Sequence, residues 1–166
     1  MKANRLFTMF LAVALFCSCL AIPASATSSA LDACAESTTI TLVPVAIIDS
    51  NGNFTSLTSR RVGTVTRAPF IRPGDMVLFG DNSGNKIPVN AGQKATVSIG
   101  IAPSGSLQLG YTLNMAHLGT WFYYGNITKA QHTASTTIAS AGNYYFSLMN
   151  TNSFALDVTN YTVTLS

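Results

Sequence analysis

The feature that most constrains the fold of this chain is a period-two alternation of apolar and polar residues. Over residues 161–165, Tyr, Val and Leu alternate with two threonines. The same pattern recurs where Val97, Ile99 and Ile101 alternate with small or hydroxyl residues, and again over 107–113. A strand places successive side chains on opposite faces, so this pattern predicts antiparallel sheets with one buried face.

Turn-forming residues separate the alternating segments. We expect strands at 38–48, 54–59, 62–68, 75–80, 94–101, 106–113, 119–125, 133–139, 143–150 and 155–165. The Asn51-Gly52 pair predicts a hairpin with a type I′ turn between the first two. No segment holds a sustained helical period. The sequence therefore predicts an all-β protein, an antiparallel β-sandwich of jelly-roll or immunoglobulin-like type with about nine or ten strands.

The first 26 residues have the composition of a secretory signal peptide. Lys2 and Arg5 precede an apolar run from Leu6 to Leu20, and Ala24-Ser25-Ala26 supplies a small-x-small cleavage site. We expect cleavage after Ala26, a flexible segment over 27–37 and a single β-sandwich domain over 38–166. No later stretch is long and apolar enough to predict a transmembrane segment in the cleaved chain.

Charge is scarce along the 166 residues: charged side chains make up 9% and the formal net charge is +3. Two of the nine Lys and Arg residues lie in the predicted signal, which leaves seven cations against six acids. A nucleic-acid-binding protein would normally show a clustered basic excess, so this class is excluded. The sequence predicts a secreted, extracellular protein.

Cysteine adds no internal cross-link to this prediction. Cys17 and Cys19 lie in the predicted signal, so Cys34 is the thiol that remains after cleavage. A single thiol cannot form an intrachain disulfide. An intermolecular disulfide through Cys34, lipid attachment and an unpaired thiol are the alternatives.

Groups for acid–base and nucleophilic catalysis are few. The chain has two histidines, His117 and His132, and six acidic residues that form no recognisable pair. Nucleophilic catalysis needs an activated nucleophile beside a base, and no Gly-x-Ser-x-Gly elbow occurs. We therefore predict that the protein is not an enzyme. The alternative is a small metal-dependent binder or hydrolase that uses His117, His132 and nearby acids.

Two loops carry alternating oxygen-bearing side chains. Asp81, Ser83 and Asn85 have the spacing with which an EF-hand loop begins, as do the corresponding residues of 49–53. Neither loop continues with the glycine and the bidentate glutamate that such a site requires. The sequence thus predicts no cofactor, with calcium at Asp81, Ser83 and Asn85 as the alternative.

Aromatic and basic residues offer the remaining candidate sites. Alternation would place Trp121 and Tyr123 on one face of a strand, and together with Tyr145 they could form an aromatic platform for a sugar ring. Four arginines fall within thirteen residues and could contact an anionic surface, unless they only protect a strand edge: Arg60, Arg61, Arg67 and Arg72.

These observations favour a secreted, non-catalytic β-sandwich module that has a binding or structural role at the cell surface. A cell-surface glycan or protein is the expected partner. The second hypothesis is a self-assembling structural subunit, hence a homo-oligomer. The metal-dependent protein based on the two histidines is the third.

Overall fold

The computed structural model of the chain describes residues 36–57, 70–115, 119–128 and 131–166. This part of the chain contains strands and turns and no helix, so it holds no helix that could cross a membrane. The predicted signal peptide and nearly all of the predicted N-terminal segment lie outside the described residues.

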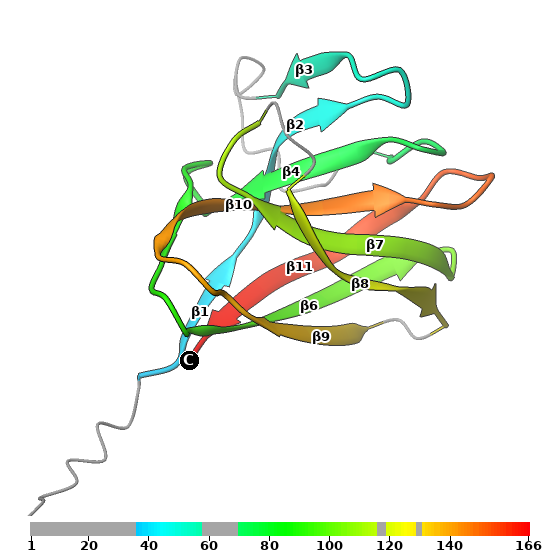
Figure 1. Ribbon diagram of the computed structural model, residues 1–166. Coiled ribbons are helices and arrows are strands. Elements are labelled where there is room, and N and C mark those ends of the chain that lie inside the picture. The colour runs from blue at the N-terminus through cyan, green and yellow to red at the C-terminus, as the bar shows by residue number, and fades with distance from the viewer. Residues whose placement is uncertain (1–35, 58–69, 116–118, 129–130) are drawn as a thin grey trace, which may run out of the picture. The chain divides into compact units, whose positions relative to one another are not determined.

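In the described part of the chain, eleven strands form two antiparallel sheets, which lie one above the other in Figure 1. The four-stranded sheet has the order β1 (Thr38–Thr41), β11 (Asp157–Leu165), β6 (Lys94–Ala102) and β9 (His132–Thr137). The seven-stranded sheet has the order β3 (Phe54–Ser56), β2 (Val43–Ile48), β4 (Met76–Gly80), β10 (Gly142–Asn150), β7 (Gly105–Thr112) and β8 (Thr120–Ile127). The seventh strand of this sheet, β5 (Ile87–Val89), lies outside that order and pairs with β10. The predicted antiparallel β-sandwich is confirmed.

The strand order is that of a jelly roll. The chain's last two strands lie in different sheets: β10 between β4 and β7, and β11 between β1 and β6. In the immunoglobulin order the last two strands are neighbours within one sheet. In a jelly roll, two Greek keys place late strands of the chain between earlier ones in both sheets, as β10 and β11 are placed here.

Two differences between the predicted and the observed strands affect the topology. Segment 38–48 is two strands, because the chain passes at Leu42 from the four-stranded sheet to the seven-stranded one. Strand β5 was not expected. Among the described strands it pairs only with β10, and proline such as Pro88 is tolerated in a strand that pairs on one side. The strand predicted at 62–68 lies outside the described residues.

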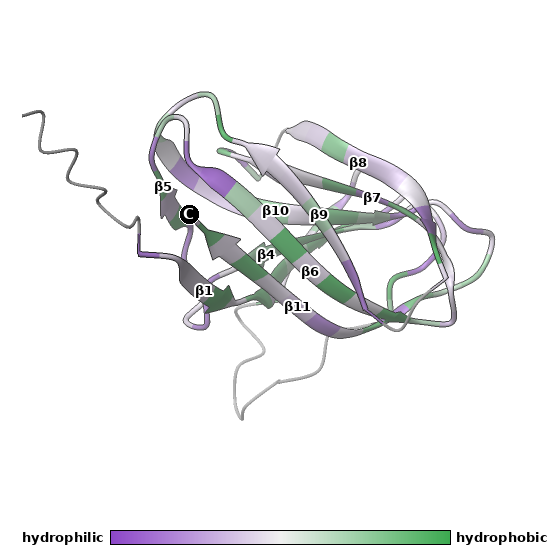
Figure 2. Ribbon diagram, turned by 90° about the horizontal axis from the view of Figure 1, so that it is seen from below, coloured by the Kyte–Doolittle hydropathy of each residue, from purple (hydrophilic) through white to green (hydrophobic). Residues whose placement is uncertain are grey.

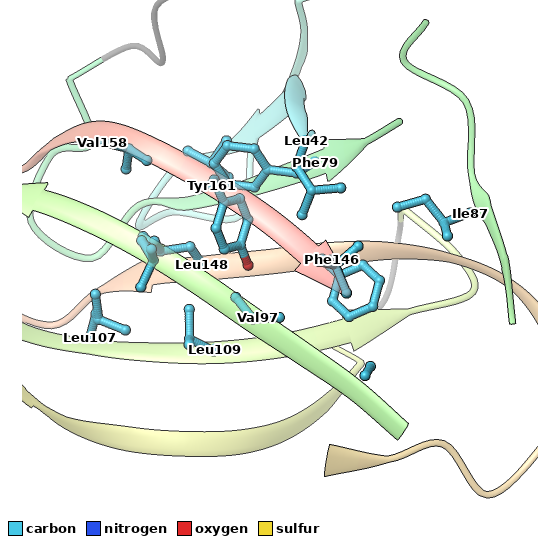
Figure 3. Close-up of a cluster of buried hydrophobic side chains, with 14 of the residues drawn as sticks. Leu42, Phe79, Ile87, Val97, Leu107, Leu109, Phe146, Leu148, Val158 and Tyr161 are labelled. Atoms are coloured by element: carbon cyan, nitrogen blue, oxygen red, sulfur yellow. The ribbon is translucent and has the colours of Figure 1, made fainter. Parts of the chain in front are cut away.

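The core lies between the two sheets and comes from the alternating segments. Val97 and Ile99 of β6 and Val163 of β11 are fully buried, and Leu107 and Leu109 of β7 face them. Figure 3 shows Tyr161 among these side chains, beside Phe79, with their ring centroids 4.2 Å apart in an edge-to-face arrangement. Burial raises the pKa of the Tyr161 phenol.

The outer face of the four-stranded sheet carries hydroxyl groups in register. Two rows cross all four strands, Thr39–Thr164–Thr96–Ser135 and Thr41–Thr162–Ser98–Thr133. Within the first row, the hydroxyls of Thr39 and Thr164 lie 2.8 Å apart and those of Thr96 and Ser135 2.9 Å apart. Figure 2 shows the resulting alternation as bands along β6 and β11.

The seven-stranded sheet carries a second apolar cluster, separate from the core, which we call the outer cluster. Its buried members come from β2, β4 and β10, and partly buried side chains pack against them. The buried members are Val45, Ala46, Met76, Leu78 and Tyr145; the partly buried ones are Ile48, Met115, Trp121 and Met149.

Candidate functional site

One cleft of about 310 Å³ opens where the end of β7, the start of β8 and the β9–β10 connection meet. We call it the aromatic cleft, because two tyrosine rings line it. Its lining residues are Tyr111, Thr112, Leu113, Gly119, Thr120, Ala139, Ser140 and Tyr144. The volume lies at the lower end of the range for small-molecule sites.

Three local features shape the aromatic cleft. The Tyr111 and Tyr144 rings pack edge to face, with centroids 5.4 Å apart. The Tyr144 hydroxyl donates a 2.7 Å hydrogen bond to the Ser140 carbonyl oxygen, which holds the β9–β10 connection against the cleft. Gly119 has a φ of +73° and lies directly against the end of β7, where a Cβ would overlap the Tyr111 carbonyl oxygen.

The aromatic cleft is polar without being charged. None of its eight lining residues has an ionisable acid or base near neutral pH, and Thr120 and Ser140 are exposed at its rim. Leu113 is 52% exposed and adds an apolar side chain. Such a surface can contact a ligand that has both an apolar face and hydroxyl groups, and it offers an ionic ligand no counter-charge.

The structure brings two of the three predicted platform residues together. Trp121 and Tyr145 belong to the outer cluster, whereas Tyr123 packs against the core. The expectation that Trp121 and Tyr123 share a face is wrong because β7 and β8 shift register between Leu109 and Gly110. The shift is a β-bulge that opposes Trp121 to Gly110 and leaves Phe122 as the extra residue, so Phe122 and Tyr123 both face the core.

The Tyr145 ring has two charged neighbours. The Lys86 ammonium nitrogen lies 5.6 Å from its centroid and donates a 2.7 Å hydrogen bond to the Leu113 carbonyl oxygen. Burial, and secondarily the negative charge of Asp81, raise the pKa of the Tyr145 phenol. A ligand role for Trp121, Tyr123 and Tyr145 stays a prediction; none of the three lines the aromatic cleft.

The two oxygen-rich loops have the same structure. In each, the aspartate Oδ1 accepts hydrogen bonds from the backbone N–H groups two and four residues later. Asp49 accepts from Asn51 and Asn53. Asp81 accepts from Ser83 and Asn85. Gly52 and Gly84 take φ of +83° and +81°. The predicted hairpin at 49–53 is present, but Asn51 has a negative φ, so the turn is not type I′.

These contacts bear on the predicted calcium ligands. Asp81 Oδ1 is occupied with Ser83 N and Asn85 N, each within 2.9 Å, so this carboxylate shapes its own loop. Asp81 and Asn82 also line a second cleft of about 460 Å³ with Thr39, Ile40 and Thr41. Calcium at Asp81, Ser83 and Asn85 stays a prediction. Within the described ranges, no three His, Cys, Asp or Glu side chains are grouped closely enough to hold a metal ion.

The remaining predicted residues are only partly described. His132 lies on β9, half-buried, with its ring centroid 4.7 Å from that of Tyr123. Its Nε2 atom is buried without a hydrogen-bond partner. Arg72 is exposed. Outside the described residues lie Cys34, Arg60, Arg61, Arg67 and His117.

No protein-family model matches the chain, and no curated protein matches its sequence. Among solved structures, it is similar to the C-terminal CBM6 of LamC, a marine laminarinase from Zobellia galactanivorans. The sequence identity is 14% and the TM-score 0.43, over 78% of this chain and 99% of that one.

The aromatic cleft itself was not predicted from the sequence. Its tyrosines and hydroxyl residues come from β7, from the start of β8 and from the β9–β10 connection. The alternation of 107–113 predicted that Tyr111 lies on the buried side of its strand. No other local pattern indicated that these residues would line a cleft. The cleft depends on which strands pair, which a local pattern does not contain.

Proposed function

We propose that this chain is a secreted, non-catalytic β-sandwich module that binds a neutral sugar in the aromatic cleft. The observation that carries the proposal is the uncharged lining, which combines the Tyr111 ring with the exposed hydroxyl residues Thr120 and Ser140. A sugar ring has an apolar C–H face that packs on an aromatic ring and hydroxyls that exchange hydrogen bonds with neutral side chains.

Secretion and the absence of catalysis are supported by the sequence. The N-terminal 26 residues have the three parts of a signal peptide. The chain offers two histidines and six acids for proton transfer, and no motif that brings them together. The partner we propose is therefore an extracellular glycan.

The first prediction tests the cleft. We expect the wild-type protein to bind a neutral glycan on an array, and titration calorimetry to give its affinity. Thr120→Val removes a hydroxyl at nearly constant volume and should weaken binding about three- to tenfold, the value of one hydrogen bond. Ser140→Ala should act in the same direction.

The matched control is Thr133→Val, an exposed threonine on β9 that does not line the aromatic cleft. It should leave the affinity unchanged. Binding of acidic glycans alone, or equal affinities for wild type, Thr120→Val and Ser140→Ala, would overturn the proposal.

A further inference from the structure

Strand β8 is an open edge of the seven-stranded sheet. It pairs with β7 on one side, and among the described strands none pairs with its other side. An open edge presents a row of unpaired backbone N–H and C=O groups, which can pair with a further strand.

The side chains of β8 do not block such pairing, and its β-bulge, another common protection of an edge, lies outside the regular segment Tyr123–Ile127. Its eight residues, Thr120–Ile127, include no charged residue and no proline, which are the usual protections of an edge. The other edge strands are shorter: β1 has four residues, β3 three and β9 six. Tyr124 of β8 is 70% exposed, so an added strand would also bury an aromatic ring.

The regular part of β8 defines where a partner strand would lie. The bulge at Phe122 interrupts the pairing with β7, and the register is continuous from Tyr123 to Ile127. Gly125 is the middle residue of this segment. An antiparallel copy of the same segment, related by a two-fold axis at Gly125, would set Tyr124 of each copy opposite Asn126 of the other.

We infer that β8 is a dimerisation edge: two copies of this chain pair β8 with β8 antiparallel across a two-fold axis and join their seven-stranded sheets. A two-fold contact uses the same surface on both copies, which an antiparallel pair of identical strands satisfies. A formal charge of +3 on the whole chain gives little repulsion between copies. The inference does not depend on the proposed sugar binding.

The test compares two double variants that change the same residues. In Tyr124→Lys/Asn126→Lys, cations face cations across the axis, and the dimer should dissociate. In Tyr124→Lys/Asn126→Glu, the introduced cation of each copy faces the introduced anion of the other, and the dimer should persist. We expect the dimer dissociation constants to differ about tenfold or more.

The measurement is light scattering after size exclusion across a concentration series, with reductant present so that Cys34 cannot cross-link copies. Thr39→Lys on the exposed edge strand β1 is the control and should stay dimeric. Hydrogen exchange on the wild type should show protection of amides 123–127 that rises with concentration, a readout that does not depend on how the variants fold.

A monomeric wild type at all concentrations would overturn the inference. So would equal dissociation constants for the two double variants, or protection of 123–127 that does not change with concentration.

Discussion

Asp49 shows at the scale of one residue how a short loop is held without burial. Hydrogen bonds from the Asn53 side chain and backbone, and then from Asn51 and Gly52, lower the pKa of its carboxyl below the ordinary value of 3.8. A carboxyl with a depressed folded pKa stabilises the fold above its unfolded pKa. That contribution is lost as the pH falls through the folded pKa.

We therefore expect Asp49→Asn to lower the thermal unfolding midpoint at pH 7 and to have a smaller effect at pH 2, because the wild-type carboxyl loses its charge as the pH falls through its folded pKa. Thermal unfolding followed by circular dichroism at both pH values measures this. Glu36→Gln, at an exposed residue before β1, is the control and should leave both midpoints unchanged. An equal loss at both pH values would contradict the prediction.

Gly119 combines a left-handed backbone with close packing. Its φ is +73°, and a Cβ would lie 2.7 Å from Thr112 Cβ, beside the Tyr111 carbonyl oxygen. Gly92 also has a positive φ, +80°, but a Cβ there would meet nothing within 4 Å. An alanine at Gly92 would therefore meet backbone strain alone, whereas an alanine at Gly119 would meet both backbone strain and steric overlap.

We expect Gly92→Ala to cost about 1–2 kcal/mol in the free energy of unfolding, from backbone strain alone. Gly119→Ala should cost a further 1–3 kcal/mol or so, because the end of β7 must also move. Urea unfolding of both variants measures the difference. Equal costs would show that the chain accommodates the added methyl group beside Tyr111.

Between elements, one buried amide joins three segments. Asn150, at the end of β10, donates from Nδ2 to the carbonyl oxygens of Ile71 and Phe154, both at 2.8 Å. Its Oδ1 accepts from the backbone and side-chain nitrogens of Asn152 at 2.9 and 2.8 Å. Asn152 in turn exchanges two hydrogen bonds with the backbone of Ser106, at the start of β7.

We expect Asn150→Ala to lower the free energy of unfolding by about 2–4 kcal/mol, because it removes the four hydrogen bonds by which this buried amide ties the end of β10 to Ile71, Phe154 and Asn152. Denaturant unfolding measures the loss. Asn143→Ala, on an exposed residue of the same strand, should change stability by no more than about 0.5 kcal/mol. Similar values for the two variants would contradict the role given to Asn150.

For the molecule as a whole, the two-residue period predicted which face of a strand is buried and that the strands form a sandwich. Val97 and Ile99, and Tyr161 and Val163, are buried as expected, because alternation within one strand decides which face meets the core. The same pattern predicted the sandwich. It could not choose between jelly roll and immunoglobulin orders, since both use the same strands and differ in their pairing.

The β8 bulge escaped prediction for a related reason. Residues 121–124 are four consecutive aromatics. The hydrophobic pattern is therefore the same whether Trp121 or Phe122 faces the core with Tyr123, and it does not reveal the extra residue of a bulge. Pairing with Leu109 and Gly110 of β7 decides which rings face the core. The aromatic cleft likewise exists only once β7, β8 and the β9–β10 connection have come together.

The pairing of β1 with β11 joins the first described strand to the last, with Thr38 opposite Leu165. Among the described strands, the partner of β1 is therefore the one farthest from it along the sequence. The four-stranded sheet cannot close before β11 has joined it, since among the described strands β11 alone connects β1 to β6. Contacts so distant along the chain form slowly. The four-stranded sheet should therefore close late in folding, after strands that are neighbours along the chain have paired.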